Sequence, residues 1–146
     1  MGRKVLAVVV ALITAWGIIL IDKMIASGMW STPNNMEYMS RSELAAYFSS
    51  RPLEANIVLL IGSVIAAFFG GYIVTNMSRR ESPGLSLSLV VAVALIFTGF
   101  LNFFVLLPGQ PAWLMAATLL SYIPVTLLGH WLTRDTGVHH EFHAAT

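Results

Sequence analysis

The residues that could do chemistry in this chain are polar side chains placed within or beside long apolar runs. Asp22 ends the first run, Asn56 begins the second, Asn102 lies in the third, and Thr118 and Ser121 lie in the fourth. Ionisable groups at membrane depth are costly to bury, so they often mark binding or transport sites. We interpret these five residues as a candidate polar pocket on the outer side of a membrane. A lipid head group or a quinone-like ligand would suit it.

A purely structural role for the same residues stays open. Asp22 is followed by Lys23, and both are shallow enough to extend their charged ends to the lipid head groups. Asn102 could bond a neighbouring helix, which contributes a modest ~0.6 kcal/mol within a membrane.

Other chemistry has few candidates. The chain has four histidines, seven carboxylates and no cysteine, and it shows no nucleophile–base pair, zinc-protease motif or phosphate loop. His130 at the end of the fourth run is typical of a hydrogen-bonded interfacial residue. His139, His140, Glu141 and His143 could chelate a divalent metal only weakly. We therefore predict no catalytic residues, no metal site and no cofactor.

The elements that must position these residues are four apolar runs. The chain of 146 residues is 57% hydrophobic and only 10% charged, with a mean hydropathy of +0.77, whereas soluble domains need more charge. Each run has about 20 residues, roughly 30 Å of helix, which matches the hydrocarbon thickness of a bilayer. In lipid the backbone must pair internally, so such runs form helices. The predicted fold is an all-α, antiparallel bundle of four transmembrane helices at 5–26, 55–77, 85–107 and 112–132.

Charge predicts the orientation of this bundle. Five basic residues fall in short segments on one side: Arg3, Lys4, Arg79, Arg80 and Arg134. The other side holds Lys23, Arg41 and Arg51, which are diluted by acidic residues. By the positive-inside rule, both ends are cytoplasmic. The net charge of +1 offers no basic face for nucleic acid. We expect a bacterial inner-membrane protein, with a transmembrane domain at 1–132, an outer loop at 27–54 and a cytoplasmic tail at 133–146.

The outer loop is the only sizeable element outside the runs. Ser40 and Glu43 have the spacing of a capping box and predict the start of a short helix. Leu44, Tyr47 and Phe48 would then share one face of an amphipathic helix. This helix could lie flat on the membrane surface or cover the outer mouth of the bundle, and the sequence leaves both alternatives open.

The second run carries a row of small residues at Gly62, Ala66, Gly70 and Gly71. Small residues at this spacing allow a second helix backbone to approach closely. The row therefore predicts a helix-packing interface. Its partner could be another helix of the same chain, a second copy, or a foreign subunit.

Several of these features occur together in a known pattern. An acidic residue ends the first run, Leu44–Pro52 reads LAAYFSSRP, glycines follow in the second run, and Gly99 precedes Asn102 by three residues. The outer turn reads PGQPAW, and Pro124 and Gly129 lie in the fourth run. The chain resembles a widespread group of small, uncharacterised four-helix bacterial membrane proteins over about residues 5–132. Members often carry a Glu and a nearby His where this chain has Asp22 and no histidine. The resemblance implies the fold and no particular activity.

Three functions are compatible with these observations. The first is a non-catalytic accessory or scaffold subunit of a larger inner-membrane complex, binding lipid and either partner subunits or further copies of itself. The second is a small dimeric transporter with a site around Asp22 and Asn102. The third is a membrane enzyme or cofactor carrier using His130 or the outer polar cluster. We favour the first, because the chain is small and poor in catalytic groups.

Overall fold

The computed structural model describes residues 2–30, 33–78, 85–106 and 108–136, and these residues contain no β-strand. Five α-helices are present: α1 (Gly2–Met29), α2 (Arg41–Ser49), α3 (Leu53–Ser78), α4 (Leu85–Leu101) and α5 (Ala112–Thr136). A short 3-10 helix, η1 (Met36–Tyr38), precedes α2, and a π-helix, η2 (Asn102–Leu106), continues α4.

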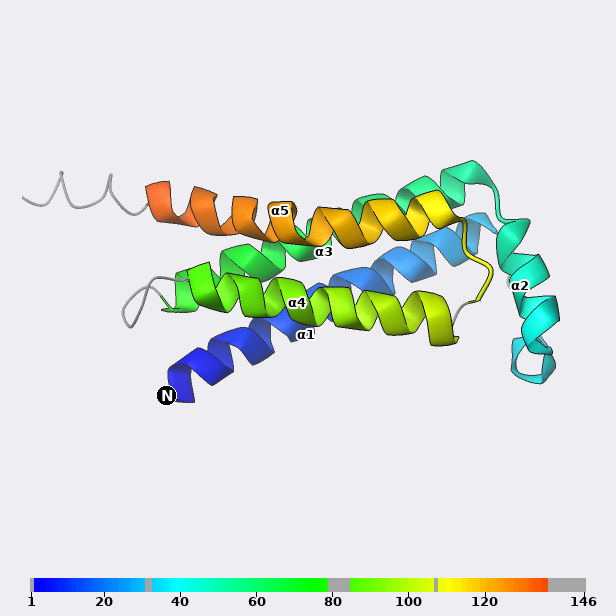
Figure 1. The fold of residues 1–146 in the computed structure, drawn as a ribbon, viewed down its shortest axis with the longest axis horizontal. Helices are drawn as coiled ribbons and strands as arrows, with labels where there is room; N and C mark the ends of the chain where they lie inside the picture. Colours follow the sequence, from blue (N-terminus) through cyan, green and yellow to red (C-terminus); the bar gives the residue numbers. More distant parts are fainter. Residues whose placement is uncertain (1, 31–32, 79–84, 107, 137–146) are drawn as a thin grey trace, which may run out of the picture.

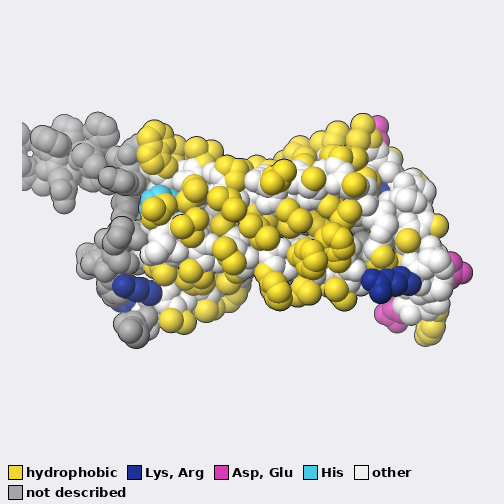
Figure 2. Space-filling model, viewed as in Figure 1, with side chains coloured by type: hydrophobic (Ala, Val, Ile, Leu, Met, Phe, Trp, Pro, Cys, Tyr) yellow, Lys and Arg dark blue, Asp and Glu magenta, His cyan; other side chains and the backbone are white. Residues whose placement is uncertain are grey.

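Four helices are long and apolar enough to cross a bilayer: Gly2–Met29, Leu53–Ser78, Leu85–Leu106 and Ala112–Thr133. Large apolar side chains such as Ile13, Phe97 and Leu120 are more than half exposed on their outer faces. Apolar side chains cover the middle of the molecule, whereas lysine and arginine side chains lie toward its two ends and acidic side chains lie at one of them (Figure 2). A lipid-facing surface has this distribution, because hydrocarbon solvates apolar groups and excludes charge. The chain is therefore an all-helical, multi-pass membrane protein.

The helix α3 is the centre of the bundle, since it packs along both α1 and α5. The helix α4 packs on α5 and α3 and makes little contact with α1. The short helix α2 lies across one end of the long helices, which we call the loop end (Figure 1). The first residues of α1 and the last turn of α5 lie at the opposite end, which we call the terminal end.

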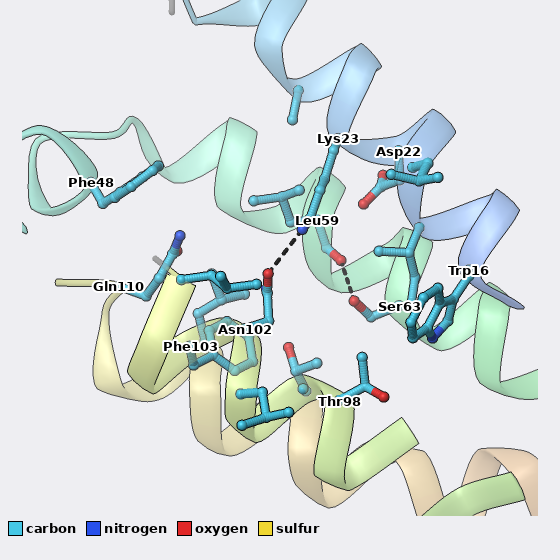
Figure 3. A pocket seen from close by; sticks show the side chains of 18 of the residues that line it. Trp16, Asp22, Lys23, Phe48, Leu59, Ser63, Thr98, Asn102, Phe103 and Gln110 are labelled. Carbon is cyan, nitrogen blue, oxygen red and sulfur yellow. Dashed lines mark hydrogen bonds between the residues drawn. The ribbon is translucent and has the colours of Figure 1, made fainter. Parts of the chain in front are cut away.

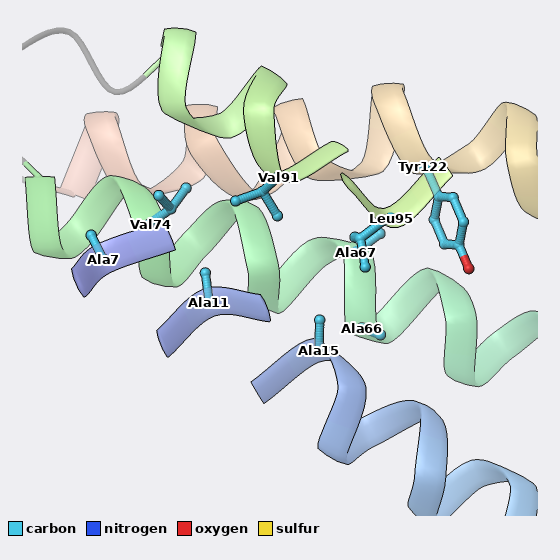
Figure 4. Packing of buried hydrophobic residues seen from close by; sticks show 9 residues of the cluster. All are labelled: Ala7, Ala11, Ala15, Ala66, Ala67, Val74, Val91, Leu95 and Tyr122. Carbon is cyan, nitrogen blue, oxygen red and sulfur yellow. The ribbon is translucent and has the colours of Figure 1, made fainter. Parts of the chain in front are cut away.

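The core near the terminal end is built from small side chains. Ala7, Ala11 and Ala15 are fully buried on α1, one helical turn apart, and face α3 (Figure 4). Residues spaced by four share one face of a helix, so these alanines form a continuous smooth stripe. Because a methyl group is the largest side chain on the stripe, α1 and α3 approach closely.

The helices α1 and α3 extend by up to three residues at each end beyond the predicted spans at 5–26 and 55–77, and the differences are larger at two other places. The third span, predicted as one helix at 85–107, changes to a π-helix after Leu101, and residue 107 lies outside the described residues. The rings of Phe100 and Phe104 stack there with centroids 4.4 Å apart. The helix α5 continues to Thr136, so residues 133–136 of the predicted tail extend the fourth helix. The predicted basic pair Arg79 and Arg80 and the histidines of the tail lie outside the described residues.

Candidate functional site: a covered cavity at the loop end

A cavity of about 780 Å³ lies among α1, α3, α4 and α5 at the loop end, beneath α2 (Figure 3). Its body is apolar, with Leu59, Leu95, Phe103 and Leu114 among the lining side chains. Sites that hold a single small molecule usually measure ~300–1,000 Å³ and combine apolar walls with a few polar groups. The polar lining residues are Asp22, Lys23, Ser27, Arg51, Ser63, Thr98, Asn102, Gln110 and Thr118.

The cavity opens sideways, between α1 and α4. Trp16 and Leu20 of α1 line it and are 52% and 61% exposed, and Phe97 of α4 lines it and is 65% exposed. These side chains therefore belong both to the cavity and to the outer surface of the bundle. Because α1 makes little contact with α4, no helix packing closes this side. The opening faces the region where the hydrocarbon of the bilayer would lie.

One hydrogen bond crosses the cavity. The Lys23 ammonium donates to the Asn102 side-chain oxygen at 2.9 Å and so connects α1 with the first residue of η2 (Figure 3). The alternative in which Lys23 extends to the lipid head groups is therefore wrong for this residue: its charged end points into the bundle. An ammonium has three N–H donors, and Asn102 accepts only one of them.

The carboxylate of Asp22 lies against the backbone of α3. Asp22 is 8% exposed, and a Cβ atom added to Gly62 would overlap its carboxyl group. Only glycine leaves room for the acid at this point of the α1–α3 interface. Among the described residues, no hydrogen bond to this carboxylate is present, and Lys23 is the cation next to it in the sequence. The small residue at position 62 thus accommodates a charged side chain, whereas Ala66 lies in the apolar core cluster.

The segment around α2 covers the cavity. Ser40 and Glu43 form the capping box that starts this helix, with the Ser40 N–H donating to Glu43 at 2.6 Å. That hydrogen bond lowers the pKa of the exposed Glu43 carboxyl. Phe48 is 2% exposed, and Leu44 and Tyr47 are partly buried against the bundle. The apolar side of α2 therefore faces the other helices.

Two contacts attach this cover to its neighbours. The Arg41 guanidinium donates to the Phe104 carbonyl at 2.8 Å, which joins α2 to the π-helix. The rings of Trp30 and Tyr47 lie 6.2 Å apart and join the end of α1 to α2. The cover is thus connected to both helices that border the side opening.

A second cation reaches the cavity from the residue before Pro52. The Arg51 guanidinium lies over the Phe48 ring, 4.9 Å from its centroid, and lines the cavity. Cation–π contacts of this kind are worth ~0.5–2 kcal/mol, more when desolvated. Burial lowers the pKa of Arg51 from its usual value. A guanidinium stays charged in proteins, so its positive charge is held in a poorly hydrated place.

Three buried polar atoms of the lining have no hydrogen-bond partner among the described residues: Trp30 Nε1, Gln110 Oε1 and Thr118 Oγ1. Gln110 is 6% exposed and Thr118 is 1% exposed. A buried polar group without a partner costs ~1–3 kcal/mol, so such groups are rare in folded proteins. Two further unpaired atoms, Asn56 Oδ1 and Thr126 Oγ1, lie outside the lining, so the cavity holds three of the five found among the described residues.

The cavity contains three of the five predicted pocket residues, Asp22, Asn102 and Thr118. Asn56 is buried on α3 outside the lining, and Ser121 donates to the Thr118 carbonyl of its own helix at 2.8 Å. Sequence reasoning missed the two cations and Gln110. Lys23 and Arg51 border apolar runs, where basic residues usually anchor a helix to the head groups. The signal available in the sequence was the adjacent pair Asp22 and Lys23, an acid followed by a lysine at membrane depth.

The row of small residues on α3 is occupied within the chain. Gly62 contacts Asp22, and a Cβ atom on Gly70 would meet Val91 at 3.1 Å. A Cβ atom on Gly71 would overlap the Thr126 carbonyl, so α5 crosses α3 there in direct backbone contact. The row therefore packs three different helices of the same chain.

A polar cluster at the terminal end joins α3, α4 and α5. The Thr75 hydroxyl donates to the Gly71 carbonyl at 2.8 Å and lies 2.9 Å from His130 Nδ1 and 3.1 Å from Ser88 Oγ. Thr75 and Ser88 are 4% and 0% exposed, so no substrate reaches them. Among the described residues, no group of three or more His, Asp or Glu is placed to hold a metal ion. This cluster connects helices.

The cavity therefore combines apolar walls with two cations, one carboxylate and three unpaired polar atoms. A molecule that matches this lining would be largely apolar and would carry polar atoms that reach Lys23, Arg51 and the unpaired groups. Comparison with known proteins adds no relative: no family model, no curated protein and no solved structure matches this chain.

Proposed function

We propose that this protein binds one amphiphilic molecule of the bilayer in the cavity beneath α2, and that it does so as a non-catalytic component of a membrane assembly. The cavity itself carries the proposal. Its body is apolar and opens sideways, whereas its cations and unpaired polar atoms lie on or just after α1, next to α2, and just before or within α5. An amphiphile has the same division between an apolar chain and a polar end.

The experiment that tests this proposal is photolabelling in lipid nanodiscs with two probes. Both carry a diazirine on the same alkyl chain, and they end in an alcohol or in a sulfonate. Labelling of peptides from the cavity walls should be removed by excess unlabelled amphiphile, because one site saturates. Labelling of lipid-facing peptides should persist. If excess unlabelled amphiphile does not reduce the labelling by either probe, the cavity does not hold an amphiphile and the proposal is wrong.

Matched variants on one helix connect the labelling to the cavity. Thr98 of α4 lines the cavity, whereas Val93 of the same helix is 62% exposed and lies outside the lining. Thr98→Phe should fill the cavity and abolish the competed labelling, and Val93→Phe should preserve it. Ser63→Phe fills the cavity from α3 and controls for a folding defect of the first variant. Equal labelling of all three variants would contradict the proposal.

The proposed setting is the bacterial cytoplasmic membrane, with an antiparallel bundle and both termini in the cytoplasm. The helix directions in Figure 1 and the basic residues Arg3 and Lys4 before the first span support it. The chain has no cysteine, so single substitutions can be labelled without background. An impermeant maleimide should label Ser49→Cys from outside intact cells and Gly2→Cys only after lysis. The reverse pattern would invert the topology.

A scaffold role would add partner subunits or further copies of the chain. The row of small residues on α3 is occupied internally, so a partner would contact outward apolar faces such as those of Ile13 and Val93. Extraction of the native protein in mild detergent should yield a particle larger than one chain. A monomer without co-purifying protein would remove the scaffold role and leave the binding proposal intact.

A transporter is the second candidate, because Asp22 and Asn102 share one cavity. A carrier would have to expose this cavity to both sides of the membrane, and the buried carboxylate would bind or release a coupling ion. Flux into proteoliposomes with equal rates for the wild type and Asp22→Asn would exclude this role for the acid.

A further inference from the structure

The charges that face the cavity do not balance. Lys23 and Arg51 are its cations, and Asp22 is the only described carboxylate in its lining. Two cations and one carboxylate leave one unmatched positive charge in a site beneath a protein cover. Charges in such places are costly without a partner of opposite sign, because water solvates them poorly.

Both cations also retain hydrogen-bonding capacity. Lys23 gives one N–H to Asn102, and its two other donors have no acceptor among the described residues. The Arg51 guanidinium carbon lies over the Phe48 ring, 4.9 Å from its centroid, and its N–H groups donate no hydrogen bond among the described residues. Arginine N–H groups that are left free in this way are usual donors to oxyanions.

Two of the unpaired neutral groups add donors of the same kind. The Trp30 indole N–H can only donate, and the Thr118 hydroxyl has one hydrogen to give. The unpaired Gln110 Oε1 is an acceptor, so it belongs to a different class from these two donors. This donor-rich lining is independent of the charge count, and it leads to the same class of ligand: a head group made of oxygen acceptors.

We propose that the ligand is a singly charged oxyanion on an apolar chain, with its head group bound between Lys23 and Arg51. This inference depends on the proposed function and specifies its ligand. A carboxylate and a phosphodiester both have this chemistry. Asp22 limits the charge to one: it compensates one cation and would repel a second negative charge.

The two photoprobes test the head group directly, because they share one chain and differ only in charge. The sulfonate stays ionised, so its competed labelling should saturate at concentrations about tenfold to a hundredfold lower than those the alcohol needs. This is the range expected for hydrogen bonds to charged groups. Equal concentrations for both probes would overturn the charge assignment while leaving the amphiphile site established. Absence of competed labelling by either probe would instead refute the proposed function.

Substitution of the cations gives a second readout. Lys23→Met and Arg51→Met should each remove most of the preference for the sulfonate while leaving labelling by the alcohol nearly unchanged. Lys23→Arg should restore most of it. Lys4→Met is the matched control, since Lys4 lies at the terminal end of the same helix outside the lining. An undiminished preference in both cavity variants would overturn the assignment, and thermal unfolding verifies that each variant is folded.

The acid gives the most distinctive outcome, because its removal should strengthen binding. Asp22→Asn should lower the sulfonate concentration needed for saturation several-fold, and weaker binding would contradict its proposed part in the charge balance. Competition by oleate, phosphatidylglycerol and phosphatidylcholine then identifies the source. Displacement by oleate alone indicates a carboxylate, and displacement by phosphatidylglycerol indicates a phosphodiester lipid. Equal displacement by phosphatidylcholine would refute the preference for an anion.

Discussion

The two ends of the bundle are packed in opposite ways. At the terminal end, helices meet through backbone: Gly71 lies against the Thr126 carbonyl, and Gly129 lies against the Phe68 carbonyl. At the loop end, α1 and α4 stand apart around a cavity of about 780 Å³. Both ends are built by the same four helices. The comparison teaches that close packing of helix backbones holds the bundle together at one end, whereas the other end keeps the volume in which we propose that a ligand binds.

One face of α1 shows how the sequence makes this change. The face carries Ala7, Ala11 and Ala15, each fully buried, and then Asp22, 8% exposed, two turns further on. Small apolar side chains allow α3 to pack directly against the first part. At the second part, the Asp22 carboxyl group occupies the space that a side chain at Gly62 would fill. A polar group lies there between the two helices in place of small apolar side chains.

The largest expected effect comes from adding a methyl group at the terminal end. Gly71→Ala places a Cβ atom onto the Thr126 carbonyl, and a backbone atom cannot rotate away. The helices α3 and α5 must separate, so we expect a loss of at least about 3 kcal/mol, the upper end for overpacked cores. Thermal unfolding in nanodiscs measures it. Gly17→Ala is the control, because nothing lies within 4 Å of that position, and its unfolding should stay within about 1 kcal/mol of the wild type.

If Gly71→Ala unfolds like the wild type, α3 and α5 are not in backbone contact and the contrast between the two ends loses its basis. If Gly17→Ala is as unstable as Gly71→Ala, close helix packing does not explain the loss of stability. Both glycines would then be required for the flexibility of their helices.

An intermediate effect is expected from Phe48→Ala at the loop end. This side chain is 2% exposed, and truncation of a buried phenylalanine can cost ~3–5 kcal/mol, but the loss cannot exceed the smaller free energy that docks the short helix α2. Because α2 is a separate short helix, the cost should appear as its undocking and leave the terminal end intact. Hydrogen exchange should accelerate in residues 41–49 and stay unchanged around Ala11. Tyr38→Ala, at a side chain that is 88% exposed, should change neither. Faster exchange along all four long helices would show that the two ends unfold together.

The smallest effect is a pH dependence of α2. The Ser40 N–H lowers the pKa of Glu43, so the ionised carboxylate stabilises the helix start. This contribution is complete above the unfolded carboxyl pKa of about 4.3 and disappears as pH falls through the lower folded pKa. Protection factors of α2 amides should therefore decrease in acid, and Glu43→Gln should remove that step. A step of equal size in both proteins would assign it to another group.

The parts of the fold that could be predicted are those that local sequence patterns determine. Four apolar runs of bilayer length fix four helices, because lipid offers no other way to pair the backbone. The capping box at Ser40 and Glu43 is equally local and is present in the structure. The π-helix at Asn102–Leu106 has no such signal. It depends on the stacking of Phe100 and Phe104 and on Arg41, which comes from a distant segment.

The site was predictable in part for the same reason. Asp22 and Asn102 are visible as polar residues at membrane depth, since their cost does not depend on which helix they face. The directions in which the Lys23 and Arg51 side chains point could not be predicted, because a long side chain at a membrane boundary can turn outward or inward. Asn102 and the Phe48 ring decide this, and both are brought there only by the fold.

The position of α2 has a consequence for how affinity must be measured. Because Arg41 ties α2 to the π-helix over the cavity, and the cavity opens between α1 and α4, the amphiphile that we propose would enter from the hydrocarbon of the bilayer. Occupancy should therefore follow the mole fraction of the amphiphile among the lipids. Adding empty vesicles at a fixed total ligand concentration should empty the site, because the ligand is diluted in two dimensions while its aqueous concentration hardly matters.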